Sequence, residues 1–141
     1  MIDILFVCTG NTCRSPMAEA LYNALGKGRA ASAGVAAAVG MPLSRGAAEA
    51  LRTRGLSLTN HRARRVDEAM LKAAHRVYVM ERAHLDALVS KFPAHAPKIS
   101  LLKEGADVPD PVGAGPAEYE ACAASIEAAV KILAARSQAH A

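Results

Sequence analysis

The sequence has no tryptophan and few other aromatic side chains: its 141 residues include two phenylalanines and three tyrosines. Proteins that bind single-stranded nucleic acid stack bases on aromatic side chains interleaved with basic ones, and no such interleaving occurs here. The formal net charge of +4 at pH 7 favours the approach of an anion without specifying which anion. We therefore expect no nucleic-acid partner.

Long apolar runs and paired cysteines are also missing. No run approaches the roughly 18 apolar residues that a membrane span needs, and the first seven residues, without a basic side chain, are too short for a signal peptide. The three cysteines form neither an even disulfide framework nor a paired zinc pattern. We expect a cytoplasmic protein away from membranes, with reduced thiols of which at least one is kept for its reactivity.

Apolar residues, many of them alanine, make up 52% of the chain, and its length of 141 residues is common for a single domain. Strand and helix patterns alternate, which predicts one α/β domain over residues 1–141, a parallel sheet with helices on both faces, and a tail that frays after about residue 137. Ligands of such sheets bind at the carboxyl ends of the strands. The predicted strands cover residues 2–7, 29–32, 76–80 and 98–102, and the predicted helices cover residues 15–25, 44–54, 67–74, 83–92 and 116–136.

The first predicted strand runs into a loop, Cys8 to Ser15, whose residue types suit an anion-binding turn. Successive backbone N–H groups in a strand-to-helix turn form a nest for an anion, which the helix N-terminus completes. Gly10 and Asn11 tolerate the positive φ that a sharp bend needs, and Arg14 supplies a fork of donors that fits two phosphoryl oxygens. The loop is therefore predicted to bind a phosphoryl group.

The thiol of Cys8 lies at the base of this predicted loop. The helix dipole, the loop amides and the Arg14 guanidinium all favour its thiolate form, so we interpret Cys8 as a nucleophile. Ser15 is either the N-cap of the following helix, a hydrogen-bond donor to that thiolate, or both. A bare Cys-x5-Arg pattern occurs easily by chance, but a strand before it and a Ser-Pro helix start after it make this one specific.

A cysteinyl-phosphate mechanism also needs a group that protonates the leaving group and later activates water. Asp110 is the candidate, because it lies between two prolines in a loop that follows the last predicted strand. Such a loop can reach the same sheet edge as Cys8. From the spacing alone, an ordinary Asp-Pro turn is an equal interpretation.

The chain resembles the low-molecular-weight protein phosphatases, a family that includes tyrosine phosphatases and bacterial protein-arginine phosphatases. The resemblance spans nearly the whole chain and is strongest, in matching order, over residues 7–21, 32–34, 61–64 and 110–111. It implies a four-stranded parallel sheet, a phosphorylated protein substrate, and catalysis without a metal or cofactor. It also implies that Cys8 is the nucleophile, Arg14 a phosphate ligand, and Asp110 the acid and then the base.

The resemblance further implies how the loop is supported. Asn11, Ser32 and His61 would form a hydrogen-bond network that holds it. Cys13 would be the second loop cysteine, able to trap Cys8 in a reversible disulfide on oxidation, although packing of the loop is an equal interpretation for it. The phosphate-binding loop would comprise Thr9, Gly10, Asn11, Thr12, Cys13 and Ser15.

Substrate choice is predicted to depend on Thr12. Tyrosine-directed members of the family usually have an aliphatic residue there, whereas a loop with threonine resembles that of the arginine phosphatases. A hydroxyl can meet a polar phosphoguanidinium group where isoleucine would present only methyl groups. Val112 departs from the aromatic residue that members of either kind often place after Asp-Pro. We favour phosphoarginine, with phosphotyrosine as the alternative.

Two other classes fit less well. An arsenate reductase would need further downstream cysteines to relay a disulfide, and only Cys122, deep in the last helix pattern, remains. A non-enzymatic phosphoprotein-binding module would keep Arg14 but have no use for Cys8 or Asp110. The prediction is therefore a cysteine-dependent protein phosphatase, for which we favour a monomer.

Overall fold

The computed structural model describes residues 2–139 and contains one parallel sheet of four strands in the order β2-β1-β3-β4. The four-stranded parallel sheet implied by the sequence is therefore confirmed. Every neighbouring pair is parallel, so each connection crosses the sheet through a helical segment. The strands are β1 (Ile2–Cys8), β2 (Ala30–Gly34), β3 (Ala74–Val79) and β4 (Ile99–Leu101).

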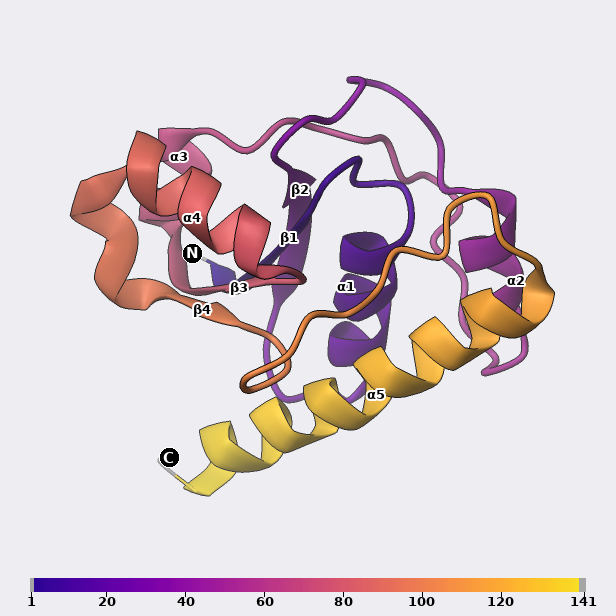
Figure 1. The fold of residues 1–141 in the computed structure, drawn as a ribbon. Helices are drawn as coiled ribbons and strands as arrows, with labels where there is room; N and C mark the ends of the chain where they lie inside the picture. The colour runs from indigo at the N-terminus through magenta and orange to yellow at the C-terminus, as the bar shows by residue number, and fades with distance from the viewer. Residues whose placement is uncertain (1, 140–141) are drawn as a thin grey trace.

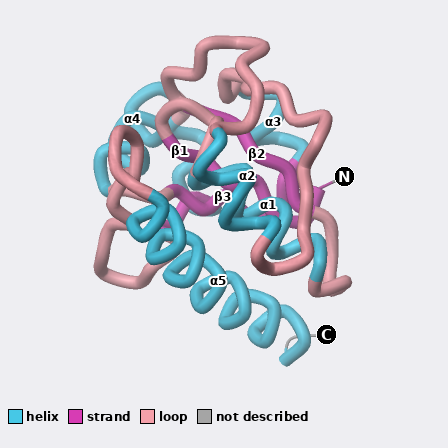
Figure 2. The backbone as a smooth tube through the Cα atoms, turned by 90° about the vertical axis from the view of Figure 1, so that its right-hand side faces the viewer, coloured by secondary structure: helices cyan, strands magenta, loops and turns pink. Residues whose placement is uncertain are grey.

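Helices cover both faces of this sheet, as predicted. Figures 1 and 2 show α1, α2 and α5 on one side of the strands and α3 and α4 on the other. Their bounds are α1 (Arg14–Ala24), α2 (Arg45–Arg52), α3 (Glu68–Ala73), α4 (Arg82–Lys91) and α5 (Pro116–Ala139), with a 3-10 helix η1 (Pro93–Lys98) before β4.

Strand β1 lies in the middle of the sheet and is apolar on both faces, as strands of covered parallel sheets are. Ile4, Phe6 and Cys8 join the buried cluster formed with α1 and α5. Leu5 and Val7 join the cluster on the opposite face. All five are at most 4% exposed. The end of β1, where the loop begins, is thus held by packing from both sides.

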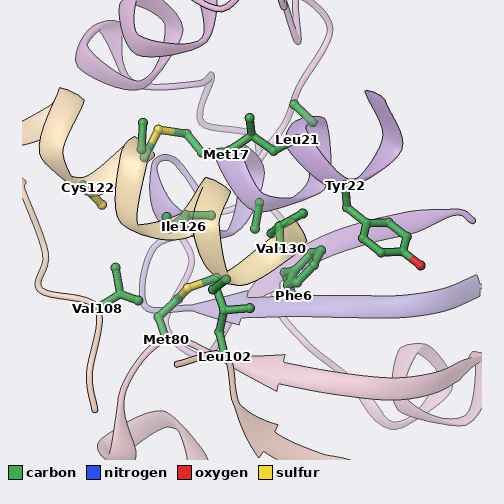
Figure 3. Packing of buried hydrophobic residues seen from close by; sticks show 14 of the residues in the cluster. Phe6, Met17, Leu21, Tyr22, Met80, Leu102, Val108, Cys122, Ile126 and Val130 are labelled. Carbon is green, nitrogen blue, oxygen red and sulfur yellow. The ribbon is translucent and has the colours of Figure 1, made fainter. Parts of the chain in front are cut away.

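The long helix α5 lies across α1 and closes the larger of the two clusters (Figure 3). Ile126 and Val130 of α5 pack in that cluster with Met17 and Leu21 of α1, and each is at most 5% exposed. Burial of such a side chain contributes about 1.5–3 kcal/mol. Although α5 has 24 residues, no helix within residues 2–139 is apolar enough over sufficient length to cross a membrane.

Several element boundaries differ by a few residues from the sequence predictions, and two of the differences are informative. The N-cap of α1 is Cys13 instead of Ser15, and Arg14 and Ser15 are buried residues of its first turn. The Ser15 hydroxyl is engaged by the loop, so tertiary contacts override its local capping preference. Helix α5 extends to Ala139, where a frayed tail was predicted after about residue 137; the last part of that prediction lies outside the described residues.

Gly34, the last residue of β2, permits a close approach between β2 and the loop after β1. A Cβ atom at this position would lie 2.5 Å from the Thr9 carbonyl oxygen and 3.0 Å from the Asn11 amide nitrogen. Both atoms are backbone and cannot turn aside. The residues after β2 also bond to the loop, because the Val35 N–H donates to the Cys8 carbonyl at 2.9 Å.

We predict that Gly34→Ala displaces the loop, destabilises the protein by about 1–3 kcal/mol and lowers kcat/KM for para-nitrophenyl phosphate by at least about 10-fold. Urea unfolding and steady-state kinetics measure the two effects. Gly28→Ala is the control for the kinetics, because its Cβ would meet side-chain atoms of Asp3 and Tyr22 and no backbone atom of the loop. Wild-type kinetics in Gly34→Ala would contradict the prediction.

Candidate active site

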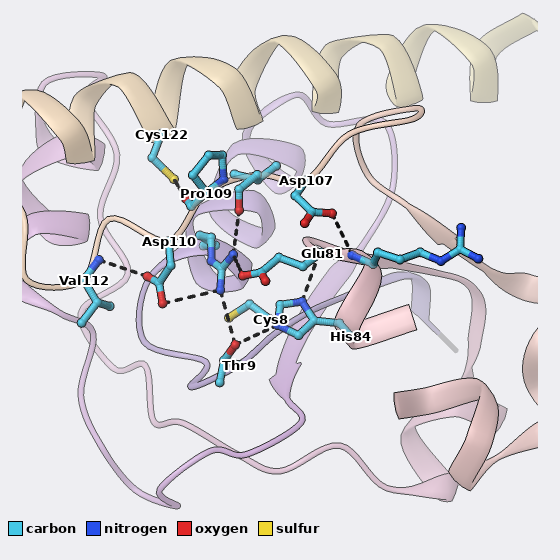
Figure 4. Close-up of polar contacts among 12 residues, drawn as sticks. Cys8, Thr9, Glu81, His84, Asp107, Pro109, Asp110, Val112 and Cys122 are labelled. Atoms are coloured by element: carbon cyan, nitrogen blue, oxygen red, sulfur yellow. Dashed lines mark hydrogen bonds and ion pairs between the residues drawn. The ribbon is translucent and has the colours of Figure 1, made fainter. Parts of the chain in front are cut away.

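The carboxyl ends of three strands meet at one edge of the sheet. The loop from Cys8 to Arg14 follows β1, and Glu81 follows β3. Beyond β4 the chain returns to the same edge, where the Val108 N–H donates to the Met80 carbonyl at 2.8 Å. This contact brings Asp110 to the loop, with its Oδ2 atom 3.7 Å from Nη2 of Arg14 (Figure 4).

The Cys8 thiol is 2% exposed and lies 2.9 Å from the hydroxyl oxygen of Ser15. Asn11 Nδ2 donates to that same oxygen at 2.9 Å, so the hydroxyl proton of Ser15 is free to point toward the sulfur or toward the Ala33 carbonyl at 3.3 Å. Cys8 also faces the N-terminus of α1. The sulfur of Cys8 is therefore within hydrogen-bond distance of a side chain in the first turn of α1.

Asn11 is the centre of the loop's support. It is fully buried and has a φ of 58°, which asparagine tolerates better than most residues. Its Nδ2 donates to Ser32 at 3.0 Å, its Oδ1 accepts from the Arg64 N–H at 3.0 Å, and its carbonyl oxygen lies 2.6 Å from His61 Nε2. The structure therefore brings Asn11, Ser32 and His61 together around the loop.

Arg14 is the most enclosed charge of the site, with 2% of its side chain exposed. Its Nη1 atom forms an ion pair with Glu81 and donates to the Val108 carbonyl at 2.7 Å. Its Nη2 atom lies 3.4 Å from the Thr9 hydroxyl and 3.7 Å from Asp110. The Nη1 side of the guanidinium is thus anchored by Glu81 and Val108, while Nη2 lies beside Thr9 and Asp110.

Sequence reasoning missed Glu81 and His84, which follow β3 and lie beside Arg14 and Thr9 (Figure 4). The available signal was their place after a strand, because ligands of parallel sheets bind at the carboxyl ends of several strands. Two supporting contacts were also missed: Glu19 accepts from the Ser32 hydroxyl at 2.7 Å, and Arg64 Nε donates to the Ser32 carbonyl at 3.0 Å.

Thr12 lies within the loop from Cys8 to Arg14, whereas Val112 lies outside it, beside Asp110. Thr12 is half-buried, and its carbonyl accepts from the Ser44 N–H at 2.8 Å. Val112 is 64% exposed, and its N–H donates to Asp110 Oδ1 at 3.0 Å, which fixes one oxygen of that carboxylate. Gly10 is half-buried and lies near Thr12, whose hydroxyl would be 3.7 Å from a Cβ at Gly10.

Cys13 and Cys122 are neighbours, which the sequence did not indicate. Both are buried in the same cluster as Cys8. The hydrogen bond to Cys122, with burial, raises the pKa of Cys13, while the same bond and the charge of Arg14 lower the pKa of Cys122. Cys13 therefore stays protonated. Cys122 also lies 3.9 Å from the Pro109 carbonyl (Figure 4).

No group of three or more His, Cys, Asp or Glu side chains suited to a metal ion occurs among the described residues. Each buried side-chain nitrogen or oxygen in the described part of the chain has a hydrogen-bond partner within the protein. The arrangement is a thiol at a helix N-terminus, beside a guanidinium and a carboxylate. Such a set can bind a phosphoryl group and attack it.

A model of the low molecular weight phosphotyrosine protein phosphatase family matches residues 3–140. The chain belongs to this family. It is 38% identical over 143 residues to a protein-arginine-phosphatase of Geobacillus stearothermophilus, covering 96% of this chain and 95% of that protein. It is also 38% identical over 130 residues to the low molecular weight protein-tyrosine-phosphatase YfkJ of Bacillus subtilis, covering 82% and 83%.

Solved structures give the same assignment. The YwlE arginine phosphatase from Geobacillus stearothermophilus superimposes with a TM-score of 0.95 at 35% identity, over 99% of this chain and 95% of that chain. A low molecular weight protein tyrosine phosphatase from T. tengcongensis superimposes with a TM-score of 0.91 at 41% identity, over 96% and 99%. This family member is therefore a phosphatase, and its relatives include both substrate classes.

Replacement of Asn11 tests the support of the loop. We predict that Asn11→Ala destabilises this phosphatase by about 3 kcal/mol, because it leaves buried partners unsatisfied and puts alanine at positive φ. Asn11→Gly relieves the strain of the positive φ but does not restore the hydrogen bonds. Its free energy of unfolding should therefore be about 1 kcal/mol higher than that of Asn11→Ala. Urea unfolding measures both variants. Equal stability of the two would show that the backbone of residue 11 relaxes freely.

Proposed function

We propose that this phosphatase hydrolyses phosphoarginine in proteins, with Cys8 as the nucleophile. The main support is the geometry of the loop: the buried Cys8 thiol contacts Ser15 in the first turn of α1, and Arg14 of the same turn lies 3.7 Å from Asp110. The relatives alone do not choose the substrate, since an arginine phosphatase and a tyrosine phosphatase match at the same 38% identity. Thr12 is the residue that favours phosphoarginine, because its hydroxyl can meet a polar leaving group.

In the first step, the Cys8 thiolate attacks phosphorus and the phosphorus–nitrogen bond to the substrate guanidine breaks. Arg14 and the loop N–H groups hold the phosphoryl oxygens, whose negative charge they stabilise. Asp110, protonated, gives its proton to the departing nitrogen. The products of this step are the free arginine side chain and a cysteinyl phosphate. A solved arginine phosphatase is described as a cysteine-to-serine mutant with a phosphorylated active site serine.

In the second step, the Asp110 carboxylate removes a proton from water, and the water oxygen attacks phosphorus. The sulfur–phosphorus bond breaks, inorganic phosphate leaves, and the Cys8 thiolate is restored. Two contacts support this role: one carboxylate oxygen of Asp110 accepts from the Val112 N–H at 3.0 Å, and the other lies 3.7 Å from Arg14 Nη2. Its side chain is 42% exposed, so water can reach it.

Asp110→Ala should lower kcat on a phosphoarginine peptide by about 10²- to 10⁴-fold, because without an acid the departing guanidine nitrogen would have to leave as an anion. The loss should be smaller with para-nitrophenyl phosphate, whose leaving group needs less protonation. Steady-state kinetics on both substrates measure this, with Cys8→Ser as the inactive reference. Equal losses on the two substrates would assign Asp110 a role other than acid catalysis.

The substrate proposal is tested by comparing kcat/KM on phosphoarginine and phosphotyrosine peptides of one sequence. Wild type should prefer phosphoarginine, and Thr12→Ile should shift the ratio toward phosphotyrosine by about 10-fold or more, because methyl groups replace a hydroxyl. Thr12→Ser, which keeps the hydroxyl, is the control. A strong wild-type preference for phosphotyrosine would overturn phosphoarginine as the substrate. An unchanged ratio in Thr12→Ile would exclude Thr12 as the specificity filter.

A further inference from the structure

His84 is a buried histidine of the site that the mechanism above does not use. It lies in the first turn of α4 with 3% of its surface exposed. Its Nδ1 atom accepts a hydrogen bond from the Glu81 N–H at 3.1 Å, and its Nε2 atom lies 2.8 Å from the Thr9 hydroxyl oxygen. Figure 4 shows the ring between these two partners, facing the loop.

These two contacts determine the protonation state of the ring. A backbone N–H can only donate, so Nδ1 of His84 must be an acceptor without a proton. The proton of the neutral ring is then on Nε2, which donates to Thr9. Burial and the positive charge of Arg14 lower the pKa of His84, which agrees with a neutral ring.

Thr9 contacts both His84 and Arg14 through its hydroxyl oxygen. Its hydroxyl oxygen accepts from His84 Nε2 and lies 3.4 Å from Arg14 Nη2, the nitrogen that also faces Asp110. A hydroxyl oxygen has two acceptor lone pairs, and these two donors would use both. Thr9 thus has a fixed orientation although the residue as a whole is exposed.

We propose that His84 is a positioning residue that acts through Thr9 to hold the Arg14 guanidinium in its phosphoryl-binding orientation. Glu81 and the Val108 carbonyl fix the Nη1 side of the guanidinium. The chain from His84 to Thr9 restrains the Nη2 side, so the plane of the fork is set from both ends. This inference rests on the proposed role of Arg14 as a phosphoryl ligand.

Two substitutions of His84 separate this role from a purely structural one. Asparagine places its amide oxygen near the Nδ1 position, so His84→Asn keeps the bond from the Glu81 N–H and loses the bond to Thr9. Glutamine places its amide nitrogen near the Nε2 position, so His84→Gln keeps the bond to Thr9 and loses the helix cap. A positioning role and a capping role therefore predict opposite orders of activity.

We expect His84→Asn and Thr9→Val each to lower kcat for para-nitrophenyl phosphate by about 10- to 30-fold. KM should change less than about 3-fold, because misorientation of Arg14 affects the transition state more than the bound substrate. His84→Gln and Thr9→Ser should recover most of the loss. The double variant of His84→Asn and Thr9→Val should be no slower than the worse single variant, since both break the same chain.

The reverse order, with His84→Asn active and His84→Gln impaired, would overturn the positioning role in favour of helix capping. Equal losses of kcat in His84→Asn and His84→Gln, with wild-type kcat in Thr9→Val, would also overturn it. So would strictly additive losses of kcat in the double variant. Arg14→Lys separates failure of this inference from failure of the mechanism: if Arg14→Lys is inactive while His84→Asn matches wild type, only the role of His84 is wrong. If Arg14→Lys retains full activity, the role of Arg14 itself is wrong.

The neutral ring has a separate signature in stability. Because the pKa of His84 is lowered on folding, the unfolded chain binds the proton first, and stability falls as pH drops below about 6.5. The Tm advantage of wild type over His84→Gln should therefore shrink between pH 7.5 and pH 5. Arg14, Glu81, Asp107 and Asp110 surround the ring in both proteins, so their effects largely cancel. A constant difference would contradict the neutral assignment.

Discussion

The guanidinium of Arg14 is a positive charge withdrawn almost completely from water, and the arrangement of the site follows from its need for partners. Removing such a charge from water costs several kcal/mol unless ion pairs and hydrogen bonds replace the lost hydration. The partners come from three separate parts of the chain: Thr9 after β1, Glu81 after β3, and Val108 with Asp110 after β4. One side chain thus links the three strand ends that form the edge of the sheet.

The loop that carries Arg14 also needs rigid support from the residues packed behind it. In the proposed mechanism Arg14 binds a phosphoryl group, and this requires that the loop backbone keep its shape when the group binds. Asn11 provides that support through side-chain bonds to Ser15, Ser32 and the backbone of Arg64. Gly34 allows β2 to approach closely enough for these bonds to form. The supporting contacts satisfy each other, so the loop is organised before any substrate binds.

The parts that sequence could predict are those encoded locally. The strand into Cys8, the bend at Asn11 and the helix after Arg14 fall within one short segment, where residue type and order indicate a phosphate-binding turn. Asp110 became a firm candidate only through resemblance, because spacing does not distinguish it from an Asp-Pro turn. For Ser15, the sequence allowed an N-cap, a hydrogen bond to Cys8, or both; the structure has the contact with Cys8 and a different N-cap, and the bond from Asn11 cannot be seen from local preference.

Glu81 and His84 were missed because their partners are distant in sequence: Glu81 contacts Arg14 across 67 positions, and His84 contacts Thr9 across 75. Nothing in the periodicity of α4 predicts these contacts. Only the parallel topology, which places the end of β3 beside the end of β1, brings them together. The side-chain pairing that tunes the site is therefore a property of the sheet and not of the loop motif.

The charge balance of the site explains why a neutral donor suits position 84. In the proposed mechanism Arg14 is the cation that attracts a phosphoryl dianion, and Glu81 offsets part of its charge. A second cation in place of His84 would repel Arg14 at the point where Thr9 holds it, and an anion would compete with the substrate. A neutral ring whose one acceptor is occupied by the Glu81 N–H can only donate toward Thr9. It therefore orients the guanidinium without changing the charge that the substrate meets.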